Sequence, residues 1–394
     1  MKVDLVRTAL LIPGLKGRRG LPLLLEGSPG TVKTDKIEAV AAELGLACLT
    51  LSPGESGEGA FGVTPVPVDR EGRTLLTYPP GEWIRLFENS DGSPKGGVLF
   101  IDEIGCAPPG LRAALLGLVL ARRIGGNTLP EGTRVIGALN PTSESADGWD
   151  LPAPLANRCG HLHWDGGSVD DWCEWRVGAA PARTHGKPGD EEKRIDAEWP
   201  DAFAIASGLI AGFIRTRPHL LHKMPPPGDP AASHAWPSRR TWDMATHALA
   251  GAIVCNLSTV DTEEFIAAFV GEGPTAEFVA YRLAADLPNP ARLLDGLEQW
   301  TPDPARLDRT YAILSACTAY VVAPTTAKRQ ERAIALWRIC ATLQATMSDA
   351  TVPVVKALLS AGLGHRTPEA AKVLGPLDKV LRDAGIRADL ERSR

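Results

Sequence analysis

The chain has 394 residues, of which 44% are hydrophobic and 23% are charged, and its formal net charge is −5 at pH 7. This length exceeds what one hydrophobic core usually organises, so two or three domains are expected. The acidic balance argues against a protein that grips nucleic acid through its overall charge, although a local basic patch is compatible with it. Seven cysteines without a CxxC pair or zinc-type spacing indicate reduced thiols.

The N-terminal segment lacks the pattern of a targeting signal. Arg7 interrupts its short apolar stretch, and Pro13 and Gly14 follow. No apolar run in the sequence reaches the length that a bilayer-spanning helix needs. The sequence therefore predicts a soluble, cytoplasmic protein without membrane insertion.

Strand and helix patterns alternate in the first part of the chain. An apolar run over residues 21–25 predicts a buried strand, and helical spacing over residues 34–44 predicts a helix that ends at Gly45. Residues 63–68 and 73–78 flank a polar turn like the strands of a β-hairpin. This alternation predicts a parallel sheet covered by helices on both faces. The other expected elements are strands over 47–51, 97–101 and 134–139 and helices over 81–89 and 111–123.

Helical patterns replace strands beyond about residue 164. No repeat recurs at a fixed period, which argues against a helical solenoid. The charged run from Glu191 to Arg194 is typical of a solvated helix start. The expected helices cover residues 168–178, 195–214, 238–255, 262–270, 275–285, 304–322, 326–347 and 352–362.

A phosphate-type loop lies between the first strand and the first helix. Its glycines let backbone N–H groups turn toward phosphate oxygens at a helix N-terminus, and its lysine is placed to reach the β- and γ-phosphates of ATP. Its threonine offers a hydroxyl to Mg²⁺. The alternative is an ordinary turn followed by an accidental Lys-Thr pair. The loop consists of Gly27, Ser28, Pro29, Gly30, Thr31, Val32, Lys33 and Thr34.

One position of this loop departs from the general Walker A pattern. Val32 stands where the pattern asks for glycine, directly before Lys33. A β-branched residue there either keeps an ordinary helical backbone, which nucleotide binding tolerates, or crowds the phosphates and weakens binding.

Two carboxylates end the apolar strand predicted over residues 97–101. Asp102 would hold a magnesium ion directly or through water, and Glu103 would polarise an attacking water. An apolar strand that ends in Asp-Glu is weak evidence by itself. Because it follows a phosphate-type loop at a domain-sized interval, it indicates nucleotide hydrolysis.

Two later residues suit the same chemistry. Asn140 ends the strand predicted over 134–139, where its amide can orient water between Glu103 and the γ-phosphate, the role called sensor 1. The alternative role of Asn140-Pro141 is turn initiation. Arg158 follows at a predicted helix end, either as an arginine finger toward a neighbouring subunit or as a surface salt-bridging residue.

The order and wording of these motifs resemble the AAA+ ATPases and, within them, the MoxR-like branch. The resemblance covers roughly residues 20–255. It implies a P-loop AAA+ α/β sheet followed by an all-helical lid and a C-terminal helical region. The predicted domains are 1–165, with an inserted hairpin near 61–80, then 166–256 and 257–394. The resemblance rests on GSPGTVKT, VLFIDEIGCAPPGLRAALLGLVLARRI, LPEGTRVIGALNP, LPAPLANRCGHLHW and WPSRRTW.

The resemblance also implies residue roles outside the loop. Arg240 matches the sensor 2 arginine that contacts the γ-phosphate, with Arg239 beside it. The family's usual Asp-Arg-Phe is Asn157-Arg158-Cys159 here, so the finger is kept while its neighbours differ.

The activity that the resemblance implies is ATP hydrolysis with Mg²⁺ by a homo-oligomer, a hexameric ring. Such rings act as chaperone-like machines that remodel or mature a partner protein, commonly one with a von Willebrand A-domain. The hairpin and the loops near Phe61 are expected to face the client protein.

Two other functions fit the same residues. An ATP-gated assembly scaffold with little hydrolysis would follow if Val32 disabled the loop, but it would not need Glu103, Asn140 and Arg240. A nucleic-acid motor or loader of the same fold is disfavoured by the acidic balance and by the lack of a basic stripe.

His161 and His163 alternate along a further probable strand. A metal site would need a third ligand, which the sequence does not place, so core or surface roles are expected for both histidines.

Overall fold

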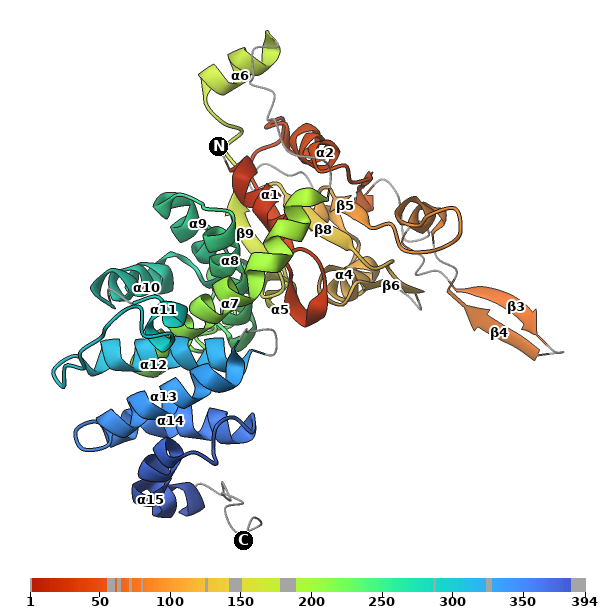
Figure 1. The fold of residues 1–394 in the computed structure, drawn as a ribbon. Coiled ribbons are helices and arrows are strands. Elements are labelled where there is room, and N and C mark those ends of the chain that lie inside the picture. The colour runs from red at the N-terminus through yellow and green to blue at the C-terminus, as the bar shows by residue number, and fades with distance from the viewer. Residues whose placement is uncertain are drawn as a thin grey trace. The chain divides into compact units, whose positions relative to one another are not determined.

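The structure is a computed structural model whose described residues form two compact units (Figure 1). The first unit comprises Met1–Ala197 and His222–Thr275, and the second comprises Glu198–Leu221 and Ala276–Arg394. The domain limits expected near residues 165 and 256 stay predictions. The described residues are 2–54, 61, 65–70, 73–78, 81–124, 127–141, 151–177, 189–285, 288–323 and 328–383.

A five-stranded, fully parallel sheet forms the centre of the first unit. The strand order is β2-β5-β8-β1-β9, so the first strand lies between two strands that come much later in the sequence. In a parallel sheet, the point where the strand order reverses opens a crevice at the carboxyl ends of the strands. The strands are β1 (Leu23–Glu26), β2 (Cys48–Leu51), β5 (Gly97–Ile101), β8 (Thr133–Leu139) and β9 (Gly160–His163).

Helices cover both faces of this sheet, as the sequence predicts. The connections through α2 (Lys33–Glu43) and α4 (Pro109–Ala121) run across the sheet in opposite directions. Because parallel crossovers are right-handed, they lie on opposite faces. Leu111 and Leu115 of α4 pack against Leu99 of the fully buried strand β5. The predicted fold class, a parallel α/β sheet with helices on both faces followed by helices, is therefore confirmed.

The remaining elements of the first unit surround the sheet and include two that were not expected, α1 and the β6–β7 ribbon. The segment expected to be a short helix before β5 is a 3-10 helix, η2. These elements are α1 (Val3–Leu11), η1 (Leu15–Gly17), η2 (Glu82–Phe87), η3 (Ile104–Cys106), β6 (Arg123–Ile124), β7 (Asn127–Thr128), α5 (Ala153–Ala156), α6 (Val169–Arg176), η6 (Pro230–Ser233), α8 (Arg239–Val254) and α9 (Thr259–Val270).

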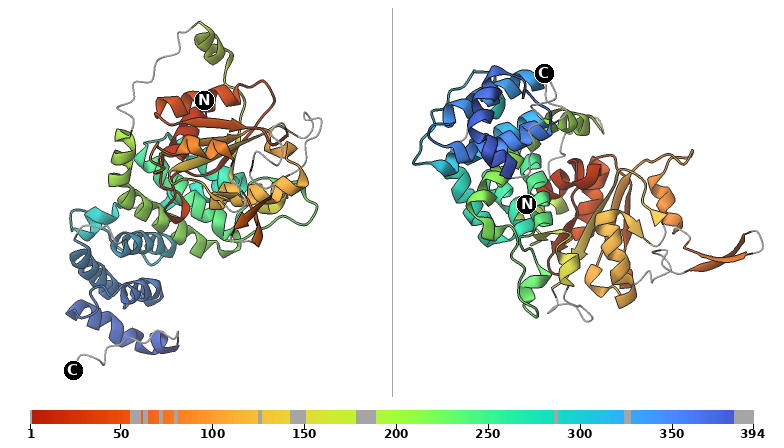
Figure 2. Two further views of the ribbon diagram at one scale, coloured as in Figure 1. Left: turned by 90° about the vertical axis from the view of Figure 1, so that its right-hand side faces the viewer. Right: turned by 90° about the horizontal axis from the view of Figure 1, so that it is seen from below.

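The expected hairpin is present and projects from the rest of the first unit (Figures 1 and 2). Strands β3 (Val66–Arg70) and β4 (Arg73–Thr77) pair antiparallel, with Arg70 opposite Arg73. The loops near Phe61, which were expected to face a client, lie mostly outside the described residues, and Phe61 itself is completely buried in a core with Leu99 of β5 and Leu111 of α4. A large aromatic ring gains more from burial than from exposure, and this core provides the space.

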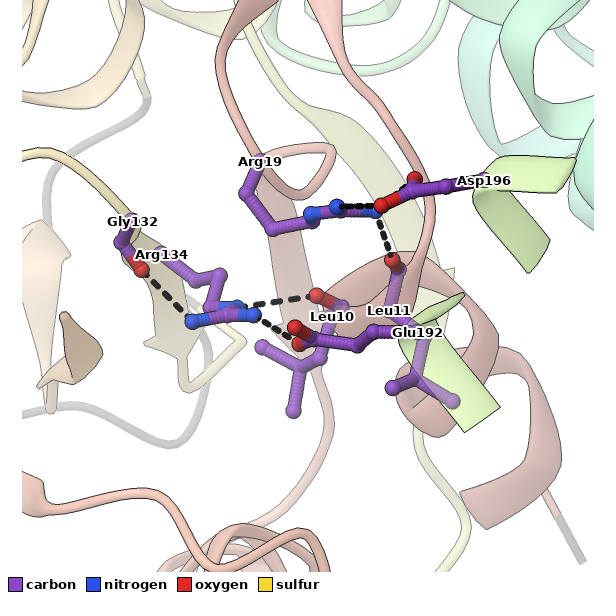
Figure 3. A network of polar contacts seen from close by, with 7 residues as sticks. All are labelled: Leu10, Leu11, Arg19, Gly132, Arg134, Glu192 and Asp196. Atoms are coloured by element: carbon purple, nitrogen blue, oxygen red, sulfur yellow. Dashed lines mark hydrogen bonds and ion pairs between the residues drawn. The ribbon is translucent and has the colours of Figure 1, made fainter. Parts of the chain in front are cut away.

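The helix α7 (Asp190–Thr216) begins inside the first unit, where its carboxylates pair with arginines of the same unit, so the expectation of a solvated helix start is wrong. Glu192 pairs with Arg134 of β8, whose Nε also donates to the Leu10 carbonyl at 3.0 Å (Figure 3). Asp196 forms a two-pronged pair with Arg19, at 2.8 and 2.6 Å (Figure 3). A third pair joins Glu191 to Arg7.

The second unit is helical throughout its described residues. Its core centres on the completely buried Trp337, whose indole N–H donates to the Leu363 carbonyl at 2.9 Å. Helices α11 and α15 were not expected. No described helix of the chain is long and apolar enough to cross a membrane. With the later part of α7, the elements are η5 (Pro218–Leu220), α10 (Glu272–Ala285), α11 (Pro290–Leu294), α12 (Leu307–Val322), α13 (Arg329–Leu343), α14 (Ser348–Ser360) and α15 (Pro368–Asp383).

The pairing of α7 with the sheet generates a stability prediction. Arg134 is 4% exposed, so Glu192→Ala leaves a buried guanidinium without its counter-charge and should lower the free energy of unfolding by about 1.5–3 kcal/mol. Asp196→Ala is the matched control, because Asp196 is 48% exposed and such a pair contributes about 0–1 kcal/mol. Urea unfolding of both variants measures the difference. Equal effects would show that burial of Arg134 does not govern the pair.

Candidate functional site

A cavity at the carboxyl edge of the sheet brings together three segments that are far apart in the sequence. The loop after β1, the end of β5 and the residue after β8 all line it. This is the crevice where the strand order reverses. Nearly all of the expected phosphate and magnesium residues therefore share one site. The lining residues are Pro29, Gly30, Thr31, Val32, Lys33, Thr34, Asp35, Asp102, Glu103 and Asn140.

The ends of neighbouring strands hold the phosphate-type loop in place. Gly27 donates its N–H to the Leu139 carbonyl of β8 at 3.1 Å. A Cβ at Gly27 would lie 2.0 Å from the Trp164 carbonyl oxygen, so only glycine fits there. The Trp164 indole N–H in turn donates to the Thr31 carbonyl at 3.0 Å. Trp164 is thus a positioning residue that the sequence pattern did not single out.

Val32 has a left-handed backbone, with φ 51° and ψ 34°. This excludes the ordinary helical backbone that was one of its two expected states. Glycine adopts the left-handed region freely, whereas a β-branched residue there is strained by about 1–2 kcal/mol. The loop therefore keeps the glycine-type backbone at this position despite the valine side chain.

Lys33 is the buried cation of the site, with 7% of its surface exposed. Its ammonium donates to the Gly27 carbonyl at 2.7 Å, to the Ser28 carbonyl at 2.9 Å and to Asn140 Oδ1 at 3.0 Å. Three oxygen acceptors thus fix the positive charge between the loop and the end of β8.

Thr34 and Asp102 meet as the predicted magnesium ligands would. The Thr34 hydroxyl donates to Asp102 Oδ2 at 2.9 Å, while Asp102 Oδ1 accepts the Glu103 N–H at 3.0 Å. Magnesium binds oxygens at about 2.0–2.1 Å in an octahedron, which places neighbouring ligand oxygens about 2.9 Å apart. The spacing of these two oxygens and their chemistry therefore fit a magnesium ion.

Asn140 connects Lys33 with Glu103. Its Oδ1 accepts from the Lys33 ammonium, and its Nδ2 donates to Glu103 Oε1 at 3.1 Å. These two partners fix which side of the amide carries the oxygen. Glu103 is exposed and has a left-handed backbone, with φ 51°. A non-glycine residue in this region is typical of functional sites, where surrounding contacts hold a strained backbone.

Arg158 and Arg240 are not among the residues that line this cavity. Arg240 is the second residue of α8 and donates to the carbonyl of Asn157, the residue directly before Arg158, at 3.5 Å. Burial and the positive charge of Arg158 lower the pKa of Arg240. Arg158 Nε is buried, and no partner for it lies among the described residues. The two arginines thus lie near each other, and their roles as finger and sensor 2 stay predictions.

Asn157 explains one departure from the usual Asp-Arg-Phe pattern. Its Oδ1 accepts from the Ser238 hydroxyl at 2.9 Å, while its Nδ2 donates to the Trp236 carbonyl at 3.4 Å. A carboxylate could accept the first bond but could not donate the second. The asparagine therefore joins α5 to Ser238, which caps α8 through a capping box with Thr241.

Glu26 is a charged residue beside the site, and the sequence motifs did not identify it. It ends β1 directly before Gly27 and contacts His161 and His234. Burial alone would raise its pKa, but hydrogen bonds from both histidines outweigh burial and hold the pKa at about 2. Glu26 is therefore an ionised carboxylate at the base of the loop.

No protein-family model and no curated protein matches the chain. Among solved structures, a similar one is the crystal structure of a "putative ATPase" from Cytophaga hutchinsonii, with 15% sequence identity and a TM-score of 0.41. The match covers 68% of this chain and 82% of that chain. A likeness of this strength carries no argument about activity, so the function is inferred from the geometry of the site.

The backbone of Val32 generates a second prediction. Val32→Gly removes the left-handed strain and should leave the free energy of unfolding within about 0.5 kcal/mol of wild type, because the relief offsets the entropy that glycine adds to the unfolded chain. Val40→Gly is the matched control, because Val40 is 2% exposed in the interior of α2 and should cost more than about 3 kcal/mol. Urea unfolding measures both. A large loss at Val32 would show that its side chain matters more than its backbone.

Proposed function

We propose that this protein is a Mg²⁺-dependent ATP hydrolase. The observation that carries the proposal is the continuous polar network in one cavity, in which Asn140 bridges Lys33 and Glu103 while Thr34 meets Asp102. A site that only held nucleotide would need the lysine and the magnesium ligands, but it would not need an amide directed at a carboxylate.

Each residue has a role in this reaction. The loop at the N-terminus of α2 and Lys33 would bind the β- and γ-phosphates. Thr34 and Asp102 would hold Mg²⁺, which neutralises charge on the phosphate oxygens when it is bound. Glu103 would accept a proton from water as the water oxygen attacks the γ-phosphorus, and the bond to the bridging oxygen of ADP breaks. Asn140 would hold that water in line.

We further propose that the active form is a ring of identical subunits, of the hexameric kind that the MoxR-like resemblance implies. Arg158 and Arg240 lie near each other but outside the set of residues that line the cavity of their own chain. Two neighbouring guanidinium groups repel each other, and a phosphate from an adjacent subunit would relieve this repulsion. This supports an arginine finger supplied in trans.

The proposed substrate of this ATP-driven work is another protein. The β3–β4 hairpin exposes apolar side chains that lack a core of their own: Val66 is 42% exposed, Leu75 47% and Leu76 68%. Apolar surface of this kind suits contact with a client protein. The MoxR-like resemblance implies a client with a von Willebrand A-domain. The net charge of −5 disfavours the alternative of a nucleic-acid motor, and the cytoplasm remains the proposed location.

The Glu103 assignment generates the prediction that tests this proposal. Glu103→Gln keeps the side-chain volume but removes the base, so ATP should bind as in wild type while turnover falls about 10²–10⁴-fold. Steady-state ATPase assays and ATP-binding titrations measure the two effects. Glu82→Gln, an exposed position on η2, is the control and should behave as wild type. Unchanged turnover in Glu103→Gln would point to another base.

The same variant tests the ring. Subunits with Arg158→Ala keep a complete phosphate loop, and subunits with Glu103→Gln keep their arginine. Mixed assemblies should therefore recover part of the turnover that each variant lacks alone. If both variants bind ATP and co-assemble but the mixture stays inactive, Arg158 does not act on a neighbouring subunit. If wild type binds ATP but does not hydrolyse it, the alternative of an ATP-gated assembly scaffold is favoured.

A further inference from the structure

Three side chains meet beside the phosphate loop without taking part in its polar network: Glu26, His161 and His234. They form what we call the Glu26 cluster. Glu26 ends β1, and His161 lies on the adjacent strand β9 in register with Leu24, so both side chains project from the same face of the sheet. His234 follows η6 in the segment that leads to α8. The possible ligand atoms all lie within 4.8 Å of one another.

Both nitrogens of the buried His161 ring lie close to oxygen acceptors. Its side chain is 4% exposed, Nε2 lies 2.9 Å from the Ala156 carbonyl oxygen, and Nδ1 lies 2.5 Å from Glu26 Oε1. Both neighbours are acceptors, whereas a neutral imidazole carries only one N–H. If Nε2 carries the hydrogen, the lone pair of Nδ1 faces a carboxylate oxygen. A metal ion at Nδ1, with the hydrogen on Nε2, would give both ring nitrogens a favourable partner.

The hydrogen bond from Nε2 to a backbone carbonyl is the support that metal-binding histidines commonly have, because it fixes the tautomer and leaves Nδ1 as the ligand. His234 completes the set from the other side: its Nδ1 lies 3.3 Å from Glu26 Oε2. Zinc binds nitrogen and oxygen at about 2.0–2.2 Å in a tetrahedron, which places ligand atoms about 3.3 Å apart. The spacing between His234 Nδ1 and Glu26 Oε2 has this value, whereas His161 Nδ1 faces the other oxygen, Oε1, and would have to shift for one oxygen to serve both rings.

An ion pair between Glu26 and one histidine explains less of the arrangement than a bound metal ion does. One protonated histidine would satisfy Glu26, yet both oxygens of the carboxylate face an Nδ1 atom, each from a different histidine. A dication uses the carboxylate and both rings at once. We propose that the Glu26 cluster binds a first-row transition-metal dication of the Zn²⁺ class, with a water as the fourth ligand. His163, exposed on the same strand, lies outside the cluster.

Such an ion would connect three parts of the first unit. It would tie the end of β1, directly before the phosphate loop, to β9 and to the segment four residues before Ser238, which caps α8. Arg240 lies in the first turn of that helix. The proposed site is separate from the Thr34–Asp102 magnesium position, and it does not depend on the proposal of ATP hydrolysis.

The test uses the full chain, from which bound metal is first removed with a chelator. Zn²⁺ is then titrated in competition with a chromophoric chelator that reports free Zn²⁺. Excess Mg²⁺ is present throughout to occupy the Asp102 position. We expect one equivalent of Zn²⁺ to bind to wild type. His234→Ala should weaken this binding at least tenfold while the fold is kept, because the His234 side chain is 58% exposed. His163→Ala, the matched control on β9, should bind as wild type. Bound Zn²⁺ should also raise the thermal midpoint of wild type more than that of His234→Ala.

Three results would overturn the proposal. The first is that wild type binds no Zn²⁺, which would leave the cluster as a set of hydrogen bonds and ion pairs. The second is that His163→Ala weakens binding as much as His234→Ala, which would place the ion elsewhere. The third is a thiolate charge-transfer band when Co²⁺ replaces Zn²⁺, which would assign binding to cysteines such as the exposed Cys173.

Discussion

The parallel pairing of β1 with β8 is the constraint on which the site depends. Glu26 lies in register with Leu139, so the phosphate loop and Asn140 leave the sheet at the same edge. The pairing of β8 with β5 brings Asp102 and Glu103 to that edge as well. Because parallel strands share one direction, three segments with no sequence proximity converge there without a dedicated scaffold.

The sheet fixes positions, and two residues with strained backbones flank the residues of the site. Val32 and Glu103 both have left-handed backbones, one directly before Lys33 and the other directly after Asp102. Each costs about 1–2 kcal/mol in a chain of L-residues. Contacts from Trp164 and Asn140 to the same segments offset this cost and hold the geometry. Strained backbone held by surrounding contacts occurs often at functional sites, and the assignment of this loop to phosphate binding stays a prediction.

Local patterns predicted much of this arrangement. The strands, the loop and the carboxylates at the end of β5 follow from residue spacing, because a buried parallel strand and a glycine-rich turn each have a sequence signature. The backbone of Val32 could not be predicted, since sterics alone disfavour the conformation that the loop imposes on it.

The sequence also could not predict which side chains pair across long distances in the chain. Glu192 had the pattern of a solvated residue, yet it pairs with the buried Arg134, 58 positions earlier. The partners of His161 lie 135 positions away, at Glu26, and on a loop after η6, at His234. Only the fold brings these residues together. Tertiary pairing leaves no local signature, and for this reason the sequence set His161 beside His163 and pointed to neither Glu26 nor His234.

The central claim is that the cavity at the carboxyl edge binds the phosphates of ATP through Lys33. Calorimetric titration of ATP with Mg²⁺ into wild type, Lys33→Ala and Lys36→Ala tests it most directly, because Lys36 lies one turn later on the same helix. The account predicts that Lys33→Ala loses measurable ATP binding while its unfolding transition stays cooperative, and that Lys36→Ala binds within about threefold of wild type. Wild-type affinity in a folded Lys33→Ala variant would contradict the account.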